Sequence, residues 1–406
     1  MSNALAADPD LIALRSELGE EDALMRRGIF TEPDTKRDYF TGYAYQTLYD
    51  WDQYFESIVQ IYMGWPSTYI KNGVTIFLDH QQPTGLISRS VPSNEYHDPE
   101  HVKPFLSQIA VLVVKAYGET EWILNDRYFP RLRKYLDYWL EEMDSTGDGL
   151  SEWMSAPHTG MDNQHERCGY WLDRFSEGVD LNAYLVRECK AFASLATQAG
   201  EEGIATAYRQ KAEALAARIR AQLWSEEDGF FYDGNARYGE TTKSQHAGWG
   251  AMNQVNESRI RVKSVAAFAA LWAQVATPEQ ARHMVFEHLF NPREFWTPFP
   301  VAALAKTERW YSRDHYPADL GCNWRAMVWI PTNYMIYQGL RSYGYGQLAS
   351  LVAYVTHDLV KRSGNREYYD AETGEGRGLD PFWGWSLLGH FMPYEESADE
   401  LITALE

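Results

Sequence analysis

The sequence predicts an all-α fold in which six helical hairpins form two concentric layers. Three observations favour it: helical periodicity occurs in adjacent pairs of segments, similar turn-forming connectors return between them, and few apolar runs suit strands. Six such pairs suggest an (α/α)6 toroid, in which an outer ring of helices wraps an inner one. An alternating β/α barrel is the competing fold, but the chain offers too few strand-like runs for eight strands.

The predicted elements follow one another along the whole chain. Residues 1–40 are expected to form an N-terminal helical extension, and a polar, tyrosine-rich segment follows it to about residue 50. The six expected helix pairs are 52–63 with 66–80, 104–118 with 126–144, 181–199 with 203–224, 254–275 with 278–289, 331–342 with 345–362, and 384–391 with 395–405. Two of these segments carry clear apolar stripes at helical spacing: Leu132, Leu136, Trp139 and Met143, then Tyr208, Ala212, Leu215, Ile219 and Leu223.

Short glycine-containing connectors are predicted to form small β-hairpins between the helices. They occupy residues 83–86, 147–150, 227–232 and 372–374. No Gly/Ser-rich, Pro-rich or low-complexity stretch divides the chain, so residues 1–406 are expected to form a single domain.

Composition limits the class of protein. The net charge of −20 argues against nucleic acid or an anionic membrane as a partner, and no apolar run reaches membrane length. The N-terminus lacks a signal-peptide pattern, and three cysteines without metal or disulfide spacing are expected to be reduced. These features predict a soluble, cytoplasmic protein, and the sequence leaves open whether it is a homo-oligomer. The 15 Trp and 27 Tyr residues suit the faces of sugar rings, although a core could absorb many of them.

Two loop carboxylates are the candidate catalytic groups. Asp162 ends the loop 155–163, two residues after Gly160, whose missing side chain lets a substrate approach the backbone. On this stretch alone, an Asx-turn or helix cap is the favoured explanation of Asp162. Glu367 lies in a similar loop near the other end of the chain, and two such carboxylates near aromatics suit acid–base chemistry on a sugar.

Other loop segments combine aromatic residues with polar ones. Trp51 and Asp52 stand at a predicted helix start, where Asp is also an ordinary N-cap, and Gln108 lies on the first turn of an otherwise apolar helix. Arg325 stands among tryptophans and needs a carboxylate or a ring face as its partner. The full set of candidate substrate-binding residues is Tyr45, Trp51, Asp52, Phe55, Gln108, Gly160, Trp324, Arg325, Trp329 and Trp383.

These segments together resemble glycoside hydrolase family 63 and the related family 37 trehalases, which are α/α toroids. Gly160-Met-Asp-Asn163 resembles the family's acid loop, and Glu367-Tyr-Tyr-Asp370 resembles the segment that bears its base. Trp324-Arg325 with Val328-Trp329 resembles a Tyr-Trp-Arg-Gly-Pro-Val-Trp segment, and Trp51-Asp52 resembles the sugar-binding Trp-Asp pair. The order agrees across nearly the whole chain, and the length is similar to the compact bacterial members, which include mannosylglycerate and glucosylglycerate hydrolases.

The resemblance implies hydrolysis of an α-glucosidic or α-mannosidic bond with inversion. Asp162 would protonate the leaving oxygen, and Glu367 would activate a water on the other face of the ring. The carboxyl groups of these two residues would then lie about 6.5–9.5 Å apart. Asp52 and Gln108 would hold hydroxyls of the sugar, while Trp51, Trp324 and Trp329 would wall the subsite. The resemblance calls for a small carbohydrate as the binding partner and for no metal or organic cofactor; galactose stays open as the sugar.

This chain departs from the family pattern on the leaving-group side. His158-Thr159 replaces a common Glu-Ser pair, Pro157 stands where compact members often place an aromatic, Asn323 replaces a Tyr, and Ala326-Met327 replaces Gly-Pro. An acidic aglycone such as glycerate needs an arginine, and after Asp162 the candidates are Arg167 and Arg174. A neutral α-linked disaccharide or short glucoside is therefore expected to be cleaved at least as well as a glycosylglycerate.

Two other classes of protein remain open at this stage. A sugar isomerase or epimerase also uses an α/α toroid, and its histidine bases would be sought among His158, His246 and His390. A non-catalytic carbohydrate-binding or scaffold protein is the other alternative. The two separate loop carboxylates argue against the latter, and a turnover assay distinguishes all three.

Overall fold

The computed structural model describes residues 5, 7–43, 46–169, 176–238, 257–314, 322–398 and 401–405. Its helices are α2 (Pro9–Glu17), α3 (Gly19–Met25), α4 (Asp52–Tyr62), α5 (Thr68–Asp79), α6 (Leu106–Tyr117), α7 (Phe129–Glu141), α8 (Ala156–Thr159), α9 (His165–Cys168), α10 (Val179–Gln198), α11 (Glu202–Arg218), α12 (Ala269–Trp272), α13 (Pro278–His283), α14 (Ile330–Ser342), α15 (Gly346–Ser363) and α16 (Leu388–Glu395). Short 3-10 or π turns extend several of them: Arg26–Gly28, Ile219–Leu223, Val265–Phe268, Met284–Leu289 and Trp385–Leu387.

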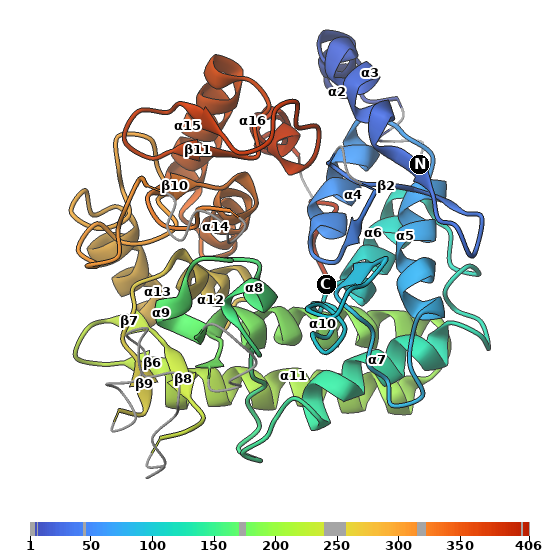
Figure 1. Ribbon diagram of the computed structural model, residues 1–406, viewed down its shortest axis with the longest axis horizontal. Coiled ribbons are helices and arrows are strands. Elements are labelled where there is room, and N and C mark those ends of the chain that lie inside the picture. The colour runs from blue at the N-terminus through green and yellow to red at the C-terminus, as the bar shows by residue number, and fades with distance from the viewer. Residues whose placement is uncertain are drawn as a thin grey trace.

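Within these residues, α4, α6, α10, α12, α14 and α16 form a closed inner ring. Each of them contacts the next in that order, and α16 contacts α4 again. Figure 1 shows the chain following this ring once around, from α4 through α10 to α15 and α16. The predicted two-layer helical fold is therefore confirmed, with the helices α5, α7, α11, α13 and α15 alternating with the inner ones along the chain.

The burial pattern explains which helices lie inside. Every residue of α4 is buried, polar ones included, whereas α11 buries one stripe and exposes the rest. A helix with water on one side needs only a stripe of apolar residues, but a helix enclosed all round must bury every side chain. Both apolar stripes predicted from the sequence, on α7 and on α11 with its π turn, are fully buried.

Short strands join the helices at their ends. They are β1 (Ile29–Thr31), β2 (Asp38–Phe40), β3 (Leu48–Tyr49), β4 (Ser90–Val91), β5 (Ser176–Glu177), β6 (Trp224–Ser225), β7 (Phe230–Phe231), β8 (Asp233–Asn235), β9 (Arg259–Ile260), β10 (Met327–Val328), β11 (Tyr368–Asp370) and β12 (Gly376–Arg377). All pairs are antiparallel, in the sheets β1-β2, β3-β4, β5-β8-β9, β6-β7 and β10-β11-β12.

Several predicted bounds were wrong. The helix expected over 254–275 is confined to Val265–Trp272 in the described residues, because Arg259–Ile260 pairs as β9 with β8. The helix expected over 395–405 is absent from the described residues, because α16 ends at Glu395 and residues 396–398 and 401–405 form turns and coil. Hairpins β6-β7 and β11-β12 occur at two of the expected connectors, whereas residues 83–86 and 147–150 form turns without a paired hairpin. No helix in the described residues is long and apolar enough to span a bilayer.

Candidate active site

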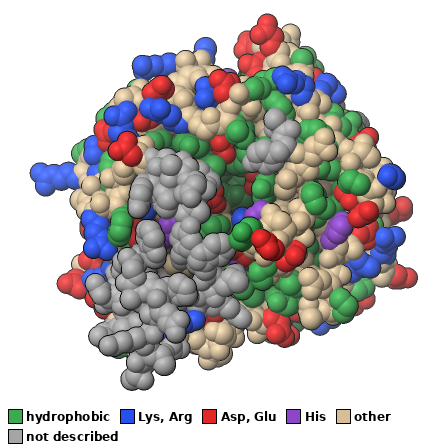
Figure 2. Space-filling view, viewed as in Figure 1, with side chains coloured by type: hydrophobic (Ala, Val, Ile, Leu, Met, Phe, Trp, Pro, Cys, Tyr) green, Lys and Arg blue, Asp and Glu red, His purple; other side chains and the backbone are tan. Residues whose placement is uncertain are grey.

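A pocket of about 180 Å³ opens at the end of the ring where several inner helices begin. It is lined by Tyr43, Tyr49, Asp50, Trp51, Asp52, Arg89, Lys103, Gly160, Asp162, Cys322, Trp324, Trp329, Glu367 and Trp385. Asp52 is the first residue of α4, and Trp329 directly precedes α14. Figure 2 shows a hollow near the centre of one face, where acidic, basic and apolar side chains meet. The volume is below the roughly 300–1,000 Å³ of drug-sized sites, so it suits one small ring.

Asp162 reaches the pocket because the loop before it turns sharply at Gly160. Gly160 ends α8 with a φ of +84°, and a Cβ there would lie 2.9 Å from the Trp51 ring. Only glycine fits both the left-handed backbone and this close approach. Burial raises the pKa of Asp162 to about 6, so the carboxyl holds a proton at mildly acidic pH. A group with that pKa can serve as a general acid.

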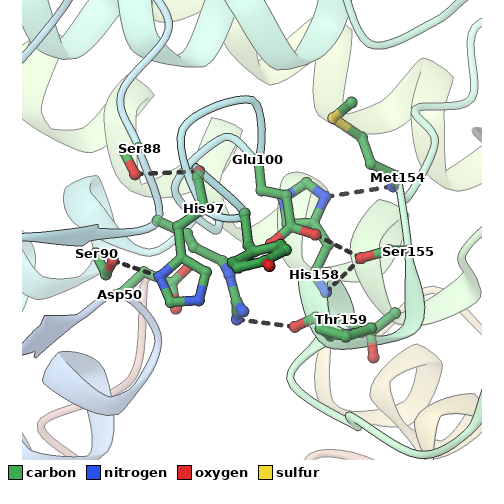
Figure 3. Close-up of polar contacts among 12 residues, drawn as sticks. Asp50, Ser88, Ser90, His97, Glu100, Met154, Ser155, His158 and Thr159 are labelled. Atoms are coloured by element: carbon green, nitrogen blue, oxygen red, sulfur yellow. Dashed lines mark hydrogen bonds and ion pairs between the residues drawn. The ribbon is translucent and has the colours of Figure 1, made fainter. Parts of the chain in front are cut away.

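The loop that carries Asp162 is fastened to its neighbours by polar side chains. The Ser155 hydroxyl accepts the amide of His158 and donates to Glu100 Oε1 at 2.5 Å, and Figure 3 shows Glu100 and Ser155 pointing toward one another. Arg89 pairs through Nε with Glu100 Oε2 at 2.5 Å, and its Nη1 donates to the carbonyl of Pro157 at 2.9 Å. The loop is thereby held in place beside Arg89.

Glu367 lies directly before β11, with 3% of its surface exposed. Burial raises its pKa, while two hydrogen bonds to the charged form oppose that rise. Its Oε1 accepts the thiol of Cys322 at 3.0 Å, and its Oε2 accepts the amide of Leu379 at 2.9 Å. Gly378 leaves room for this arrangement, since a Cβ there would lie 2.3 Å from Glu367 Oε2. Donors on both oxygens favour the ionised carboxylate that a general base requires.

A third carboxyl, that of Asp52, lines the same pocket. Burial and the neighbouring Asp50 raise the pKa of Asp52 to about 7. Lys103 is 1% exposed, and its Nζ donates to both oxygens of Asp50, at 3.0 and 3.1 Å. Asp50 is therefore already occupied by an ion pair. The carboxyl of Asp52 hydrogen-bonds Tyr43, and near neutral pH it can both donate to and accept from a sugar hydroxyl.

Aromatic rings also line the pocket and stack on one another. The ring centroids of Trp324 and Trp329 are 3.7 Å apart at an interplanar angle of 6°, and Tyr368 stacks on Trp329 at 4.6 Å. Trp51 approaches Trp324 at 5.6 Å and links this stack to the start of α4. The indole of Trp385 donates to the carbonyl of Glu367 at 3.0 Å. Such a wall offers a rigid apolar face for a sugar ring.

The structure brings some of the predicted residues together and not others. Those that line the pocket are Trp51, Asp52, Gly160, Asp162, Trp324, Trp329 and Glu367; those that do not are Phe55, Gln108, Arg325 and Trp383. Tyr45, Arg174 and His246 lie outside the described residues. The convergence of Asp52, Asp162, Trp324 and Glu367 on one pocket is thus seen, whereas their roles in binding and catalysis remain predictions.

The four predicted binding residues that do not line the pocket have partners inside the protein. Gln108 donates to the carbonyl of Pro104 at 2.9 Å and accepts from Nε of Arg187 at 3.0 Å. Phe55 packs beneath Trp51, with ring centroids 5.8 Å apart. Since these groups are occupied inside the protein, we expect them to support the pocket rather than contact a ligand.

Arg325 and Trp383 are likewise engaged. Arg325 pairs with Glu166 at 3.3 Å and lies over the ring of Trp310 at 5.5 Å. The indole of Trp383 donates to the carbonyl of Thr41 at 2.9 Å. Trp385, two residues further on, takes the place in the pocket that the sequence suggested for Trp383.

Sequence reasoning missed half of the pocket. The missed residues are Tyr43, Tyr49, Asp50, Arg89, Lys103, Cys322 and Trp385. Asp50 adjoins the Trp51-Asp52 pair and Trp385 adjoins a recognised aromatic run, so nearness along the chain was a signal for both. Cys322 directly precedes Asn323 and Trp324, so nearness along the chain was a signal there too. Arg89 carries no local pattern, because only folding brings it to the carboxylates.

Of the histidines proposed for a sugar isomerase, His158 and His390 do not line this pocket, and His246 lies outside the described residues. His158 is buried, its Nε2 lies 2.7 Å from the carbonyl of His101, and burial lowers its pKa far below the usual value. Burial lowers the pKa of His390 to about 4, and its nearest ring contact is His357. Both residues belong to the packing of the fold, so nothing in the described residues supports histidine bases at this site.

One group of side chains outside the pocket has the spacing of cation ligands. Glu32, Asp34 and His80 bring ligand atoms within 4.8 Å of one another. The oxygens of Glu32 already accept the amides of Asp34 and Thr35, at 3.1 and 2.6 Å. This geometry is that of an ordinary turn after β1.

Comparisons with known proteins identify relatives of this chain. The model of the mannosylglycerate hydrolase MGH1-like glycoside hydrolase domain matches residues 45–386. The mannosylglycerate hydrolase of Thermus thermophilus is 31% identical over 167 residues, which are 40% of this chain and 33% of that protein. The cytosolic neutral trehalase of Kluyveromyces lactis is 29% identical over 180 residues, 43% of this chain and 20% of that protein. The matches thus span a third or less of these curated relatives' lengths.

A solved structure has the same fold. The GH63 mannosylglycerate hydrolase of Thermus thermophilus, in complex with glucose, aligns with a TM-score of 0.69 at 20% identity. The alignment covers 93% of this chain and 99% of that one. The arrangement of helices is therefore shared over nearly the whole length of both chains.

Proposed function

Because the chain belongs to the mannosylglycerate hydrolase MGH1-like glycoside hydrolase family, we propose that it hydrolyses the α-glycosidic bond of a small glycoside with inversion. The observation that carries the proposal is the placement of Asp162 and Glu367 on one pocket, each hydrogen-bonded to a different atom of Cys322. Inversion requires the two carboxyls to stand about 6.5–9.5 Å apart, so that a water fits between the base and the sugar.

The two carboxyls differ in the way that this reaction needs. Asp162, with a pKa of about 6, holds the proton and delivers it to the leaving oxygen. Glu367, stabilised as a carboxylate by donors on both oxygens, removes a proton from the attacking water. Asp52 holds sugar hydroxyls, and Trp51 with Trp324 supplies the apolar face against which the sugar ring packs.

The cationic side of the pocket favours an anionic leaving group. Arg89 lines the pocket and is close enough to Asp162 to lower the pKa of that carboxyl. Arg167, the arginine that the sequence offered for this role, is 1% exposed and paired with Asp180 and Asp233. Arg89 has its Nε and Nη1 engaged by Glu100 and Pro157, but unlike Arg167 it lines the pocket, so it is the arginine that can meet an acidic aglycone. We therefore expect a glycosylglycerate to be preferred over a neutral disaccharide.

We also propose a cytoplasmic location and a single catalytic domain. A cytoplasmic location is supported by the cytosolic description of the trehalase relative and by three cysteines that are all free. A single catalytic domain with residues 1–40 as an extension fits the ring, because α2 and α3 precede the first ring helix. A homo-oligomer remains compatible with it.

The test compares substrates that differ only in charge. The purified protein is given α-mannosyl- and α-glucosylglycerate, the matching glycosylglycerols and trehalose, with NMR detection of the first anomer released. We expect the β-anomer first and a kcat/KM at least about 10-fold higher for the glycerate than for the glycerol compound. Release of the α-anomer would contradict inversion, and no turnover of any of these compounds would end the proposal.

Variants of Arg89 and Glu100 test whether Arg89 recognises the charged leaving group. Glu100→Gln alone keeps the arginine, whereas Arg89→Gln with Glu100→Gln removes both charges together and avoids a buried unpaired carboxylate. We expect the preference for the charged substrate to fall about 10-fold in the double variant and to persist in the single one. An unchanged preference in the double variant would show that another group recognises the aglycone.

A further inference from the structure

We propose that Cys322 is a positioning residue that sets the relative placement of the acid and the base through its amide and its thiol. The proposal rests on the function proposed above and adds to it a residue that contacts both carboxyls. Cys322 lies on the segment before Trp324, between the two loops that carry Asp162 and Glu367.

Two hydrogen bonds from this one residue define the arrangement. The amide of Cys322 donates to Oδ2 of Asp162 at 3.2 Å, and its thiol donates to Oε1 of Glu367 at 3.0 Å. The two carboxyls are 205 positions apart in the sequence numbering, from 162 to 367, yet a single residue links them. A displacement of either loop must therefore break or lengthen one of these bonds.

The backbone of this segment cannot shift easily, because the acid loop holds it. Asn163 Oδ1 accepts the amide of Trp324 at 2.7 Å, and Asn163 Nδ2 donates to Asn323 Oδ1 at 3.2 Å. Gln164 Nε2 donates to the carbonyl of Trp324 at 2.5 Å. The residues directly after Asp162 thus hold the residues directly after Cys322, so the acid loop and the thiol form one unit.

The thiol acts as a donor because it stays protonated. Burial together with the charges of Glu367 and Asp162 raises the pKa of Cys322 well above its usual value. A thiol donates only weakly, but a carboxylate acceptor strengthens the bond. The bond favours the ionised form of Glu367, which is the form that activates water, and the amide of Leu379 occupies the other oxygen.

The other two cysteines offer a matched control. Cys168 and Cys189 are buried, whereas Cys322 is partly exposed. Cys189 lies in the middle of α10 and does not line the pocket. Removing its sulfur tests the general effect of losing a thiol from this chain.

The first measurement is the pH profile of kcat and kcat/KM for Cys322→Ala, Cys322→Ser and Cys189→Ala. In Cys322→Ala we expect the acidic limb to move up by about 0.5–1 pH unit and kcat to fall about 3–10-fold, because Glu367 loses a donor. Cys322→Ser restores a donor and should return the limb toward the wild-type position, and Cys189→Ala should match the wild type. An unmoved limb in Cys322→Ala, or a serine variant that behaves like the alanine one, would overturn the proposal.

The second measurement does not depend on activity. Glu367→Gln removes the charge that helps to keep the thiol protonated, so Cys322 should react faster with iodoacetamide at pH 8, about 3-fold or more by mass spectrometry. Cys168 and Cys189 in the same samples report any loosening of the fold. Equal labelling of Cys322 in both proteins would overturn the contact. A wild type that cleaves no glycoside would instead refute only the proposed reaction.

Discussion

Two buried charge clusters in this chain share their burial but not their degree of neutralisation. In one, Arg167 donates to Asp233 at 2.7 and 3.0 Å and to Asp180 at 3.1 Å, and Asp180 also accepts the indole of Trp153 at 2.9 Å. The amide of Val179 adds a further donor to Asp233. In the pocket, by contrast, Asp50, Asp52, Asp162 and Glu367 share Arg89 and Lys103, which already pair with Glu100 and Asp50.

The difference separates charges that stabilise from charges that react. Donors around a buried carboxylate stabilise its charged form and oppose the rise in pKa that burial causes, as Arg167 does for Asp233. A buried carboxylate with few donors keeps its proton to a higher pH, and this is the condition for a general acid. The incompletely neutralised cluster is therefore the one we expect to perform chemistry, at a cost in stability.

The largest expected effect is on turnover. Asp162→Asn and Glu367→Gln should each lower kcat by about 10²–10⁴-fold while the circular dichroism spectrum stays that of the wild type, because each removes one proton-transfer group. Glu372→Gln is a suitable control, since Glu372 pairs with Lys306 on the connector after β11, outside the pocket. A variant that keeps near-normal turnover would remove its residue from the assigned role.

The next effect concerns the neutralised cluster. Arg167→Met leaves Asp180 and Asp233 buried without their cation, so the free energy of unfolding should fall by about 3–5 kcal/mol. Urea denaturation measures this loss. As a control, Arg209→Ala breaks a half-exposed pair with Glu202 and should cost less than about 1 kcal/mol. Equal losses in both variants would contradict the view that the buried cluster holds the fold together.

The smallest expected effect is a gain in the free energy of unfolding when Asp162 is replaced by Asn. The folded-state pKa of Asp162, about 6, lies above its ordinary value of 3.8. As the pH rises between these values, the unfolded chain loses its proton first, so stability decreases and stays lower above pH 6. Asp162→Asn cannot ionise, and its unfolding free energy should exceed that of the wild type by about 1–3 kcal/mol at pH 7–8.

Denaturation at several pH values checks this prediction. The difference between Asp162→Asn and the wild type should shrink as the pH falls through 6 toward 4, because the wild-type carboxyl then becomes neutral in both states. A difference that does not vary with pH would mean that the carboxyl is not strained by its burial. Asp180→Asn, in the neutralised cluster, should change stability in the opposite direction.

Most of the fold could be predicted from local patterns. The bounds of α4, α5, α10, α14 and α15 lie within a few residues of those expected, because their apolar periodicity and flanking turns are written in the sequence. The helix expected from residue 254 failed where Arg259–Ile260 pairs with β8, a strand about 25 residues earlier. Local hydrophobic periodicity does not reveal that a segment pairs with a strand so far along the chain.

The residues of the site also fall into those that the sequence could identify and those that it could not. Gly160 with Asp162, and Trp51 with Asp52, were recognisable because each functional residue stands in a short motif. Gln108 and Arg325 had equally suggestive surroundings, but Arg187 and Glu166 occupy them inside the protein. A polar residue in an apolar segment needs a partner, and the sequence does not tell whether that partner is a ligand or another side chain.

The sequence by itself determined the helical pairs, the acidic balance and the two loop carboxylates, because periodicity, charge and turn chemistry act over neighbouring residues. Only the tertiary structure decided that Arg89 and Cys322 lie beside Asp162, and that Arg167 is enclosed by Asp180 and Asp233. The ring brings residues from both ends of the chain to one pocket, and burial then fixes which charges are neutralised and which keep a proton. Burial and charge pairing depend on distances in space, which separations along the chain do not supply.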